Sequence, residues 1–236
     1  MSIGYSKFDL LLIVYLLLTY NIMIDIGISS SLFSSYFTTT FVGPEELTAN
    51  EKLLTTKFAD KRLKDFSTGR FCARKAMELI GYEPCEILMG TDKQPIWPKG
   101  IVGSISHTSK LTGAVVGLNG QIRAIGVDIE AIGKINTEMW RLLYTEKEKD
   151  LLNSLPPEQI AYYTTLFFSF KESFYKMQHP LTNTYLDFID VEISRLDDQF
   201  IIKVLKQFSE SNLLPTATSL HYQQEKNQII TWCYLV

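Results

Sequence analysis

The chain of 236 residues is 46% hydrophobic and 12% aromatic, which supports a packed core and excludes a disordered or collagen-like protein. Its formal net charge of -3 at pH 7 disfavours a general nucleic-acid binder, because such proteins are usually basic. The cysteines are widely separated and form no C-x-x-C pair, so we expect core thiols of a cytoplasmic protein rather than disulfides or a zinc site: Cys72, Cys85 and Cys233.

A strongly apolar segment near the N-terminus, Leu10–Leu18, is open to three interpretations. It is shorter than the ~20 residues that a membrane span needs, and no clear cleavage site follows it, which disfavours a span or an export signal. A buried strand or helix is the second interpretation. The third, which we favour, is that residues 1–22 are an extension ahead of a true start at Met23. A chain beginning there should then be soluble and fully active.

Two segments carry the capping-box pattern that begins helices, Thr48–Glu51 and Thr145–Glu148. The first predicts one long helix that continues to about Ile80. The second predicts a short helix, followed by a longer one over residues 158–179 that Pro180 ends.

Several apolar runs predict strands. The turn pair Asn119-Gly120 predicts a hairpin between the strands 112–118 and 121–130, and a second hairpin is predicted around residues 224–227. No convincing internal repeat is visible. The predicted strands cover residues 87–89, 101–106, 112–118, 121–130, 188–193, 200–205 and 229–236.

The segment Gly126-Val-Asp-Ile-Glu130 is the first candidate for chemistry. Because side chains alternate along a strand, Asp128 and Glu130 share one face, roughly 6–7 Å apart. Val127 and Ile129 then face the core. Two carboxylates so close repel each other, and a hard cation such as magnesium relieves that repulsion. The alternative is an ordinary strand with a solvated acidic face.

The second candidate is the segment Phe168–Lys176 on the long helix. Glu172 lies about 200° around the helix from Phe170, away from the buried stripe. Glu172 and Lys176 are neighbours on the helix, which predicts either a stabilising surface pair or a third metal carboxylate beside a phosphate-binding lysine. The stripe is predicted to contain Ile160, Tyr163, Phe167, Phe170, Phe174 and Met177.

Two further groups are candidates for phosphate binding. In Ser104-Ile-Ser-His107 a hydroxyl and an imidazole follow an apolar strand and can both donate hydrogen bonds, although a lone histidine is more often structural. Arginine favours bidentate phosphate contacts, and Arg70 and Arg74 share one helix face. The alternative is a solvated helix face. The dispersed cationic residues are Arg62, Arg70, Arg74 and Lys93.

In this order the motifs resemble those of the surfactin-type 4'-phosphopantetheinyl transferases, most closely the branch typified by enterobactin synthase component D. That family carries a basic helix ending in G-R, a K-x-P loop, S-x-S-H, G-[IV]-D-x-E and [WF]-S-x-K-E-[AS]-x-x-K. The resemblance covers about residues 57–193. The matching segments are Gly69-Arg70, Lys93-Gln-Pro95, Ser104–His107, Gly126–Glu130 and Phe168–Lys176.

The resemblance implies an α+β fold of two similar halves related by a pseudo-twofold. Helices would pack on small antiparallel sheets, with the active site between the halves. We expect residues 23–125 to recognise the 3'-phosphate of coenzyme A, and residues 126–236 to carry the magnesium site and the catalytic helix.

The resemblance also implies a magnesium-dependent enzyme that transfers 4'-phosphopantetheine from coenzyme A to a serine of an apo acyl or peptidyl carrier protein, releasing 3',5'-ADP. The pathway would be siderophore, peptide or polyketide biosynthesis. We expect a cytoplasmic monomer that binds neither nucleic acid nor a membrane. The alternatives are a silent coenzyme A-binding subunit of a synthase and another magnesium-dependent phosphoryl enzyme.

Residue roles follow from the same resemblance. Glu172 and Lys176 would be catalytic, with Glu172 the candidate base. Lys176 and His107 would contact the pyrophosphate. The implied magnesium ligands are Asp128, Glu130 and Glu172, and the residues implied for the 3'-phosphate are Arg62, Arg70, Lys93 and Ser106.

Overall fold

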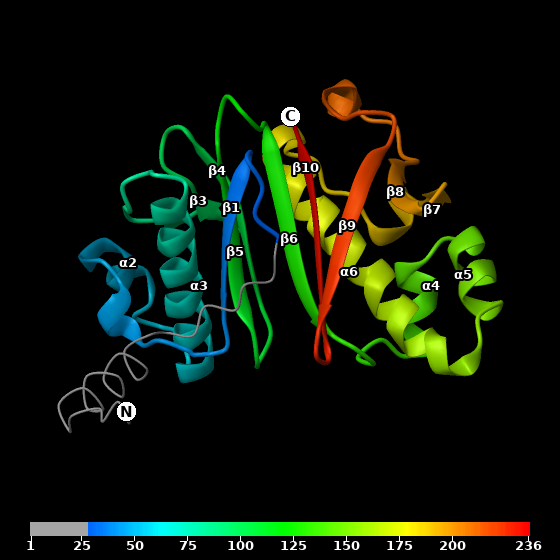
Figure 1. Ribbon diagram of the computed structural model, residues 1–236, viewed down its shortest axis with the longest axis horizontal. Helices are drawn as coiled ribbons and strands as arrows, with labels where there is room; N and C mark the ends of the chain where they lie inside the picture. The colour runs from blue at the N-terminus through cyan, green and yellow to red at the C-terminus, as the bar shows by residue number, and fades with distance from the viewer. Residues whose placement is uncertain (1–27) are drawn as a thin grey trace, which may run out of the picture.

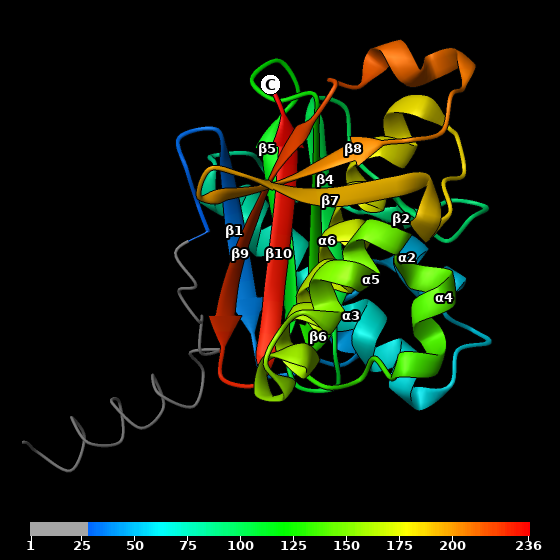
Figure 2. The ribbon, with the colours of Figure 1, turned by 90° about the vertical axis from the view of Figure 1, so that its right-hand side faces the viewer.

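The computed structural model describes residues 28–236, and the predictions for residues 1–22 lie outside the described residues. Two helix-on-sheet units stand side by side, one from each half of the chain (Figure 1). A view turned by 90° shows the helices gathered on one side of the strands (Figure 2). Each unit packs one long helix against antiparallel strands, which confirms the predicted α+β class with two similar halves.

The N-terminal unit is built on an antiparallel sheet with the strand order β1-β5-β4. Its elements are β1 (Phe33–Thr38), η1 (Pro44–Glu46), α2 (Ala49–Leu54), α3 (Asp60–Leu79), β2 (Leu88–Met89), β3 (Pro95–Ile96), β4 (Ile101–His107) and β5 (Thr112–Leu118). Phe71 and Met77 of α3 share one buried core with Tyr36 of β1 and Val116 of β5. The helix therefore covers one face of the sheet, and burial of this apolar surface holds the unit together.

The first long helix predicted from the sequence is in fact two helices, α2 and α3. Thr48 caps α2 in the predicted capping box with Glu51. The helix then stops at Thr55, whose hydroxyl donates to the carbonyl oxygen of Lys52 at 2.8 Å, a local bond that competes with helix continuation. Ala59 has an extended backbone and begins α3. The prediction of one continuous helix was wrong.

The C-terminal unit is built on an antiparallel sheet with the strand order β6-β10-β9-β8-β7. Its elements are β6 (Ala124–Ala131), η2 (Thr137–Met139), α4 (Trp140–Leu143), α5 (Glu146–Asn153), α6 (Pro157–Thr182), η3 (Phe188–Asp190), β7 (Val191–Leu196), β8 (Gln199–Val204), η4 (Ser209–Leu213), β9 (Thr218–Glu225) and β10 (Gln228–Leu235). The predicted stripe of α6 lies in the core, where Phe170 and Met177 are fully buried.

Helix α6 is longer than predicted. Pro180 does not end it but lies inside its last turn, where the missing N–H costs one hydrogen bond. Asn183 takes the left-handed conformation and closes the helix by donating its N–H to the His179 carbonyl at 2.8 Å. The helix end predicted at His179 was therefore too early.

The turn at Asn119 and Gly120 does not form the predicted hairpin. Gly120 has a φ of 128°, which glycine adopts readily, and the chain there leaves one sheet for the other. Strand β6 pairs with β10 instead, which places Asp128 opposite Thr231. The prediction of a second hairpin is confirmed by the antiparallel pair β9 and β10. A two-residue turn thus marks a change of direction without fixing the partner strand.

The two units meet where β4 lies beside β6, and serine side chains join them. Val127 donates its backbone N–H to Ser104 Oγ at 3.0 Å, and Ile129 donates to Ser106 Oγ at 3.2 Å. These hydroxyls satisfy N–H groups on an edge of β6 that, among the described strands, pairs with none. Val127 and Ile129 lie in the core between the units, as predicted.

The structure reveals a sparse internal repeat that the sequence did not suggest. Glu51 closes the capping box of α2 and binds Arg74 of α3, 23 residues later, at 2.9 Å. Glu148 closes the capping box of α5 and binds Lys171 of α6, again 23 residues later, at 2.6 Å. We call Glu51–Arg74 the N-terminal bracket and Glu148–Lys171 the C-terminal bracket. The equal spacing supports two halves built on one plan.

Two further observations concern the helices and the cysteines. Among residues 28–236, no helix combines the length and apolar character that a membrane crossing requires. Cys72 and Cys233 are buried, Cys85 is half-buried, and all three are free thiols. Burial raises the pKa of Cys233 to about 12, which leaves it protonated at neutral pH.

Candidate active site

Asp128 on β6 is the centre of a polar cluster between the two units. Its Oδ1 accepts hydrogen bonds from Lys176 Nζ at 2.7 Å and from Ser106 Oγ at 3.0 Å. Its Oδ2 accepts from Ser169 Oγ at 2.9 Å. Because Asp128 is only 3% exposed, these bonds replace the water that the carboxylate loses on burial. The cluster joins β4, β6 and α6, so residues far apart in the sequence meet here.

Glu130 and Glu172 lie half-buried near Asp128, and the three carboxylates repel one another. Burial raises the pKa of Glu130, and the charge of Asp128 adds to that shift. Burial also raises the pKa of Glu172, with a further contribution from Asp128, whereas Lys176 opposes it. Glu130 is paired with Lys134 at 3.5 Å. The cluster therefore contains three carboxylates but only two paired cations, Lys134 and Lys176.

This donor set fits magnesium by its chemistry, since carboxylate oxygens are the ligands that the ion prefers and a cation relieves their repulsion. Within residues 28–236, no three acidic, histidine or cysteine side chains group closely enough to hold an ion. The Lys176 ammonium pairs with Asp128 at 2.7 Å.

A basic pocket is lined by α3, by the chain around Lys93 and by Ile105 and His107 of β4. Its volume of about 570 Å³ is within the range of small-molecule sites. Arg62 is exposed there, with its guanidinium 4.2 Å from the centre of the Phe58 ring. His107 is 47% exposed and its Nδ1 lies 3.7 Å from Asp65. The charged and imidazole side chains that line the pocket are Lys61, Arg62, Asp65, Arg70, Lys93 and His107.

Arg70 is the buried member of this pocket. It is 6% exposed and donates to the carbonyl oxygens of Ile87 at 3.0 Å and Leu88 at 3.2 Å. Burial lowers its pKa to about 10, which still leaves the guanidinium charged at neutral pH. Arg70 therefore supplies positive charge to the pocket and also anchors the chain that enters β2.

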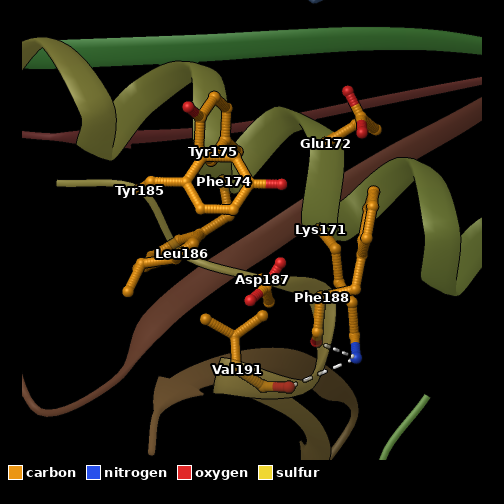
Figure 3. A pocket seen from close by; sticks show the side chains of 9 residues that line it. All are labelled: Lys171, Glu172, Phe174, Tyr175, Tyr185, Leu186, Asp187, Phe188 and Val191. Atoms are coloured by element: carbon orange, nitrogen blue, oxygen red, sulfur yellow. Dashed lines mark hydrogen bonds between the residues drawn. The ribbon is translucent and has the colours of Figure 1, made fainter. Parts of the chain in front are cut away.

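A second, largely apolar pocket is bordered by Glu172 (Figure 3). Helix α6 forms one wall and the following chain, residues 185–191, forms the other. Buried Lys171 also lines the pocket and donates to the carbonyl oxygens of Phe188 at 2.8 Å and Val191 at 3.2 Å. Burial lowers the pKa of Lys171, and Glu148 opposes that shift. The aromatic and aliphatic lining is Phe174, Tyr175, Tyr185, Leu186, Phe188 and Val191.

Two family models match the chain, one in each unit. Residues 49–117 match the 4'-phosphopantetheinyl transferase N-terminal domain, and residues 124–233 match the 4'-phosphopantetheinyl transferase superfamily. The chain belongs to this superfamily. The match confirms the family suggested by the motifs, and the second model spans Asp128, Glu130 and Glu172 together.

Individual members of the family are similar to this chain over part of its length. The 4'-phosphopantetheinyl transferase PptT of Mycobacterium tuberculosis is 33% identical, over 61% of this chain and 63% of its own length. Svp of Streptomyces mobaraensis is 34% identical, over 57% of this chain and 55% of its own length. Enterobactin synthase component D of Escherichia coli K12 is 30% identical, over 73% of this chain and 77% of its own length. The match thus spans less than two thirds of the first two relatives.

The structure of this superfamily member brings most of the predicted site residues into two neighbouring groups. Ser106 lies in the Asp128 cluster rather than in the basic pocket where it was expected, because its hydroxyl already bonds Asp128 and Lys176. Arg74 is held by Glu51. Lys176 pairs with Asp128, whereas the surface-pair alternative predicted Glu172 as its partner. The basic pocket contains Arg62, Arg70, Lys93 and His107, and the polar cluster contains Ser106, Asp128, Glu130, Glu172 and Lys176.

Some residues of the site were missed by the sequence reasoning. Ser169 lies inside the quoted helix motif, so its position was already marked, although its bond to Asp128 was not foreseen. Lys61 and Asp65 of α3 line the basic pocket, but nothing in their spacing distinguished them from a solvated helix face. Lys171 also lies inside that motif, but its burial and its bonds were not predicted.

Proposed function

We propose that this protein transfers the 4'-phosphopantetheine arm of coenzyme A to a serine of an apo acyl or peptidyl carrier protein, with magnesium, and releases 3',5'-ADP. Siderophore, peptide or polyketide biosynthesis is the setting that its relatives suggest. The observation that carries the proposal is the adjacency of three features: a carboxylate cluster, a basic pocket on one flank, and an apolar pocket beside Glu172. They suit a substrate with a pyrophosphate, a phosphorylated nucleoside and a flexible arm.

Asp128, Glu130 and Glu172 are the residues that would hold magnesium. When bound, the ion supplies positive charge against the pyrophosphate and the attacked phosphorus. Lys176 lies within reach of the same place through its bond to Asp128 and would stabilise the departing phosphate oxygens. His107, which lines the basic pocket, would donate to the pyrophosphate as well.

The transfer is a displacement at one phosphorus atom. The carrier serine oxygen forms a bond to the phosphorus that carries the pantetheine arm, and the bond from that phosphorus to 3',5'-ADP breaks. Glu172 accepts the serine proton, a role that suits a half-buried carboxylate beside the Asp128 cluster. The leaving group departs with the electron pair, next to Lys176.

The basic pocket would bind the 3'-phosphate of coenzyme A. We assign it to Arg62, Arg70 and Lys93, because these cations line the pocket. Ser106 instead orients Asp128 and Lys176. The arm would lie in the apolar pocket beside Glu172, which keeps the phosphorus next to the carboxylate cluster.

We further propose that the halves divide as 23–125 and 126–236 and that the enzyme acts as a cytoplasmic monomer. The cluster around Asp128 already takes residues from both halves of one chain, so a second copy is not required to complete it. Coenzyme A and carrier proteins are cytosolic substrates, which is why the compartment follows from the proposed reaction.

The direct test is intact-mass spectrometry of several apo carrier proteins incubated with this protein and coenzyme A, with magnesium or with a chelator. We expect at least one carrier to gain one phosphopantetheine in the presence of magnesium and none with the chelator. Binding of coenzyme A without mass gain on any carrier would support a silent subunit. Hydrolysis of phosphate esters without coenzyme A would support another phosphoryl enzyme.

Replacing Arg62 by alanine should raise the KM for coenzyme A about tenfold or more, the loss expected for one charge-assisted bond. The KM for 3'-dephospho-coenzyme A should hardly change, because that substrate lacks the group that Arg62 contacts. Arg62 is a sharper probe than Arg70, whose truncation would also release two backbone carbonyls.

The matched control for Arg62 is Lys64→Ala on the same helix, since Lys64 lies over the Phe41 ring. Both substrates should behave normally with this variant. If Arg62→Ala weakens the two substrates equally, Arg62 does not read the 3'-phosphate.

A further inference from the structure

The two brackets have the same plan but different surroundings. In the N-terminal bracket, Arg74 is 14% exposed and its other bond goes to the carbonyl oxygen of Glu46 in η1. In the C-terminal bracket, the Lys171 side chain is 1% exposed and lines the apolar pocket. The basic residue thus lies at a surface turn in the N-terminal bracket and beside the candidate active site in the C-terminal bracket.

Lys171 bonds several segments of the chain in addition to its ion-pair partner Glu148. Besides Glu148 at 2.6 Å, its ammonium lies within hydrogen-bond distance of three carbonyl oxygens: Leu143 at 2.9 Å, Phe188 at 2.8 Å and Val191 at 3.2 Å. An ammonium has three N–H groups, so four acceptors engage all of them. One side chain of α6 therefore joins the end of α4, helix α5, η3 and the start of β7.

These bonds hold the wall of the pocket that faces Glu172. Phe188 and Val191 belong to the segment 185–191, which forms the wall opposite α6 (Figure 3). One turn before Lys171, the Phe168 ring stacks on the Phe188 ring at 5.4 Å. The wall is thus fixed to α6 by the hydrogen bonds of Lys171 and by the ring contact of Phe168. Glu172, the residue after Lys171, borders the same pocket.

We propose that Lys171 is a positioning residue for the transfer reaction: it holds the segment 185–191 against α6 and so fixes the pocket beside Glu172. The inference rests on the proposed function. Its reasoning is geometric, because a reacting group displaced by about 1 Å can cost roughly 100-fold in rate. Glu148 then serves as the buried counter-ion that keeps the ammonium in place.

The test removes both charges of a bracket together, so that neither charge is left buried alone. A single Lys171→Met variant would leave Glu148 as a buried unpaired charge and destabilise the protein strongly. We therefore pair Lys171→Met with Glu148→Gln. The single amide oxygen of glutamine can still complete the capping box with the Thr145 N–H, while the Ile193 N–H loses its acceptor, as the Ile87 N–H does in the control. The matched control is Arg74→Met with Glu51→Gln in the N-terminal bracket. Melting temperature, kcat, KM and amide hydrogen exchange are measured for both.

We expect the C-terminal pair to lower kcat by about 100-fold at a temperature where both variants are folded, and to speed exchange in residues 184–191. The N-terminal pair should keep kcat within about twofold. Any effect it has should fall on KM for coenzyme A, since Ile87 bonds both Glu51 and Arg70.

Two results would overturn the positioning role: a C-terminal pair with wild-type kcat and unchanged exchange, or equal kcat losses in the two pairs. Failure of the proposed function has a different signature, because the wild-type protein would then modify no carrier. Hydrogen exchange still decides whether Lys171 holds the wall in that case, since it needs no turnover.

Discussion

Glu172→Gln should lower the rate of carrier modification by about 10²–10⁴-fold and leave the fold intact, the range expected when a general base is lost. Glutamine keeps the size of the side chain but neither accepts the serine proton nor supplies an anionic oxygen to a metal. Glu172 is off the buried stripe of α6 and half-buried beside Asp128, so its carboxylate is placed for chemistry rather than for packing. kcat is measured under saturating magnesium with purified protein.

The stability of the same variant should not fall. Burial and Asp128 raise the pKa of Glu172, which means that the folded protein disfavours its charged form. A neutral glutamine removes that repulsion, so the melting temperature without added metal should stay the same or rise. The control is Glu158→Gln in the exposed first turn of α6, which should change neither quantity. Near wild-type transfer by Glu172→Gln would remove Glu172 from the mechanism.

Gly126→Ala is expected to be the most damaging substitution outside the polar groups. A Cβ at Gly126 would lie 1.9 Å from the Ser173 carbonyl oxygen and 2.8 Å from the Met177 nitrogen. Both are backbone atoms of α6, so no side-chain rotation relieves the clash, and β6 and α6 must separate. Overpacking of this kind costs about 3 kcal/mol, which for a chain of this length lowers the melting temperature by roughly 6–12 °C.

The matched control is Gly69→Ala in α3. Its Cβ would lie 2.9 Å from the Cγ2 methyl group of Ile105, a single side-chain contact rather than a backbone one, and alanine is favoured over glycine inside a helix by about 1 kcal/mol. We expect its melting temperature to stay close to that of the wild type. Equal melting temperatures for the two variants would show that the contact between β6 and α6 is not tight. Gly126→Ala should also lose activity, because the same shift separates Asp128 from Lys176.

Much of the candidate site was predictable because local rules fix it. Alternation along β6 sends Asp128 and Glu130 to one face and Val127 to the core, and the helical period of α6 keeps Glu172 off the stripe that contains Phe170. Both capping boxes were visible for the same reason, since each forms within four residues. These relations depend on neighbours in the chain, so the sequence by itself determined them.

The partners across the chain were decided only by the tertiary structure. The Asn119-Gly120 turn has a hairpin sequence, yet β6 pairs with β10, because β1 and β4 already occupy both edges of β5. Ser106 looked like a phosphate ligand, but its hydroxyl completes the edge of β6 and bonds Asp128. Neither contact has a signature in residue spacing, since the two residues lie on different strands.

The two brackets show most clearly which contacts could not be predicted from the sequence. A threonine, a glutamate three residues later and a basic residue 23 residues after that occur twice, but three matches in a long chain do not stand out as a repeat. Lys171 likewise differs from a surface lysine only through what surrounds it. Burial, the Glu148 partner and three carbonyls come from four other segments, and only packing of the whole unit brings them to one ammonium.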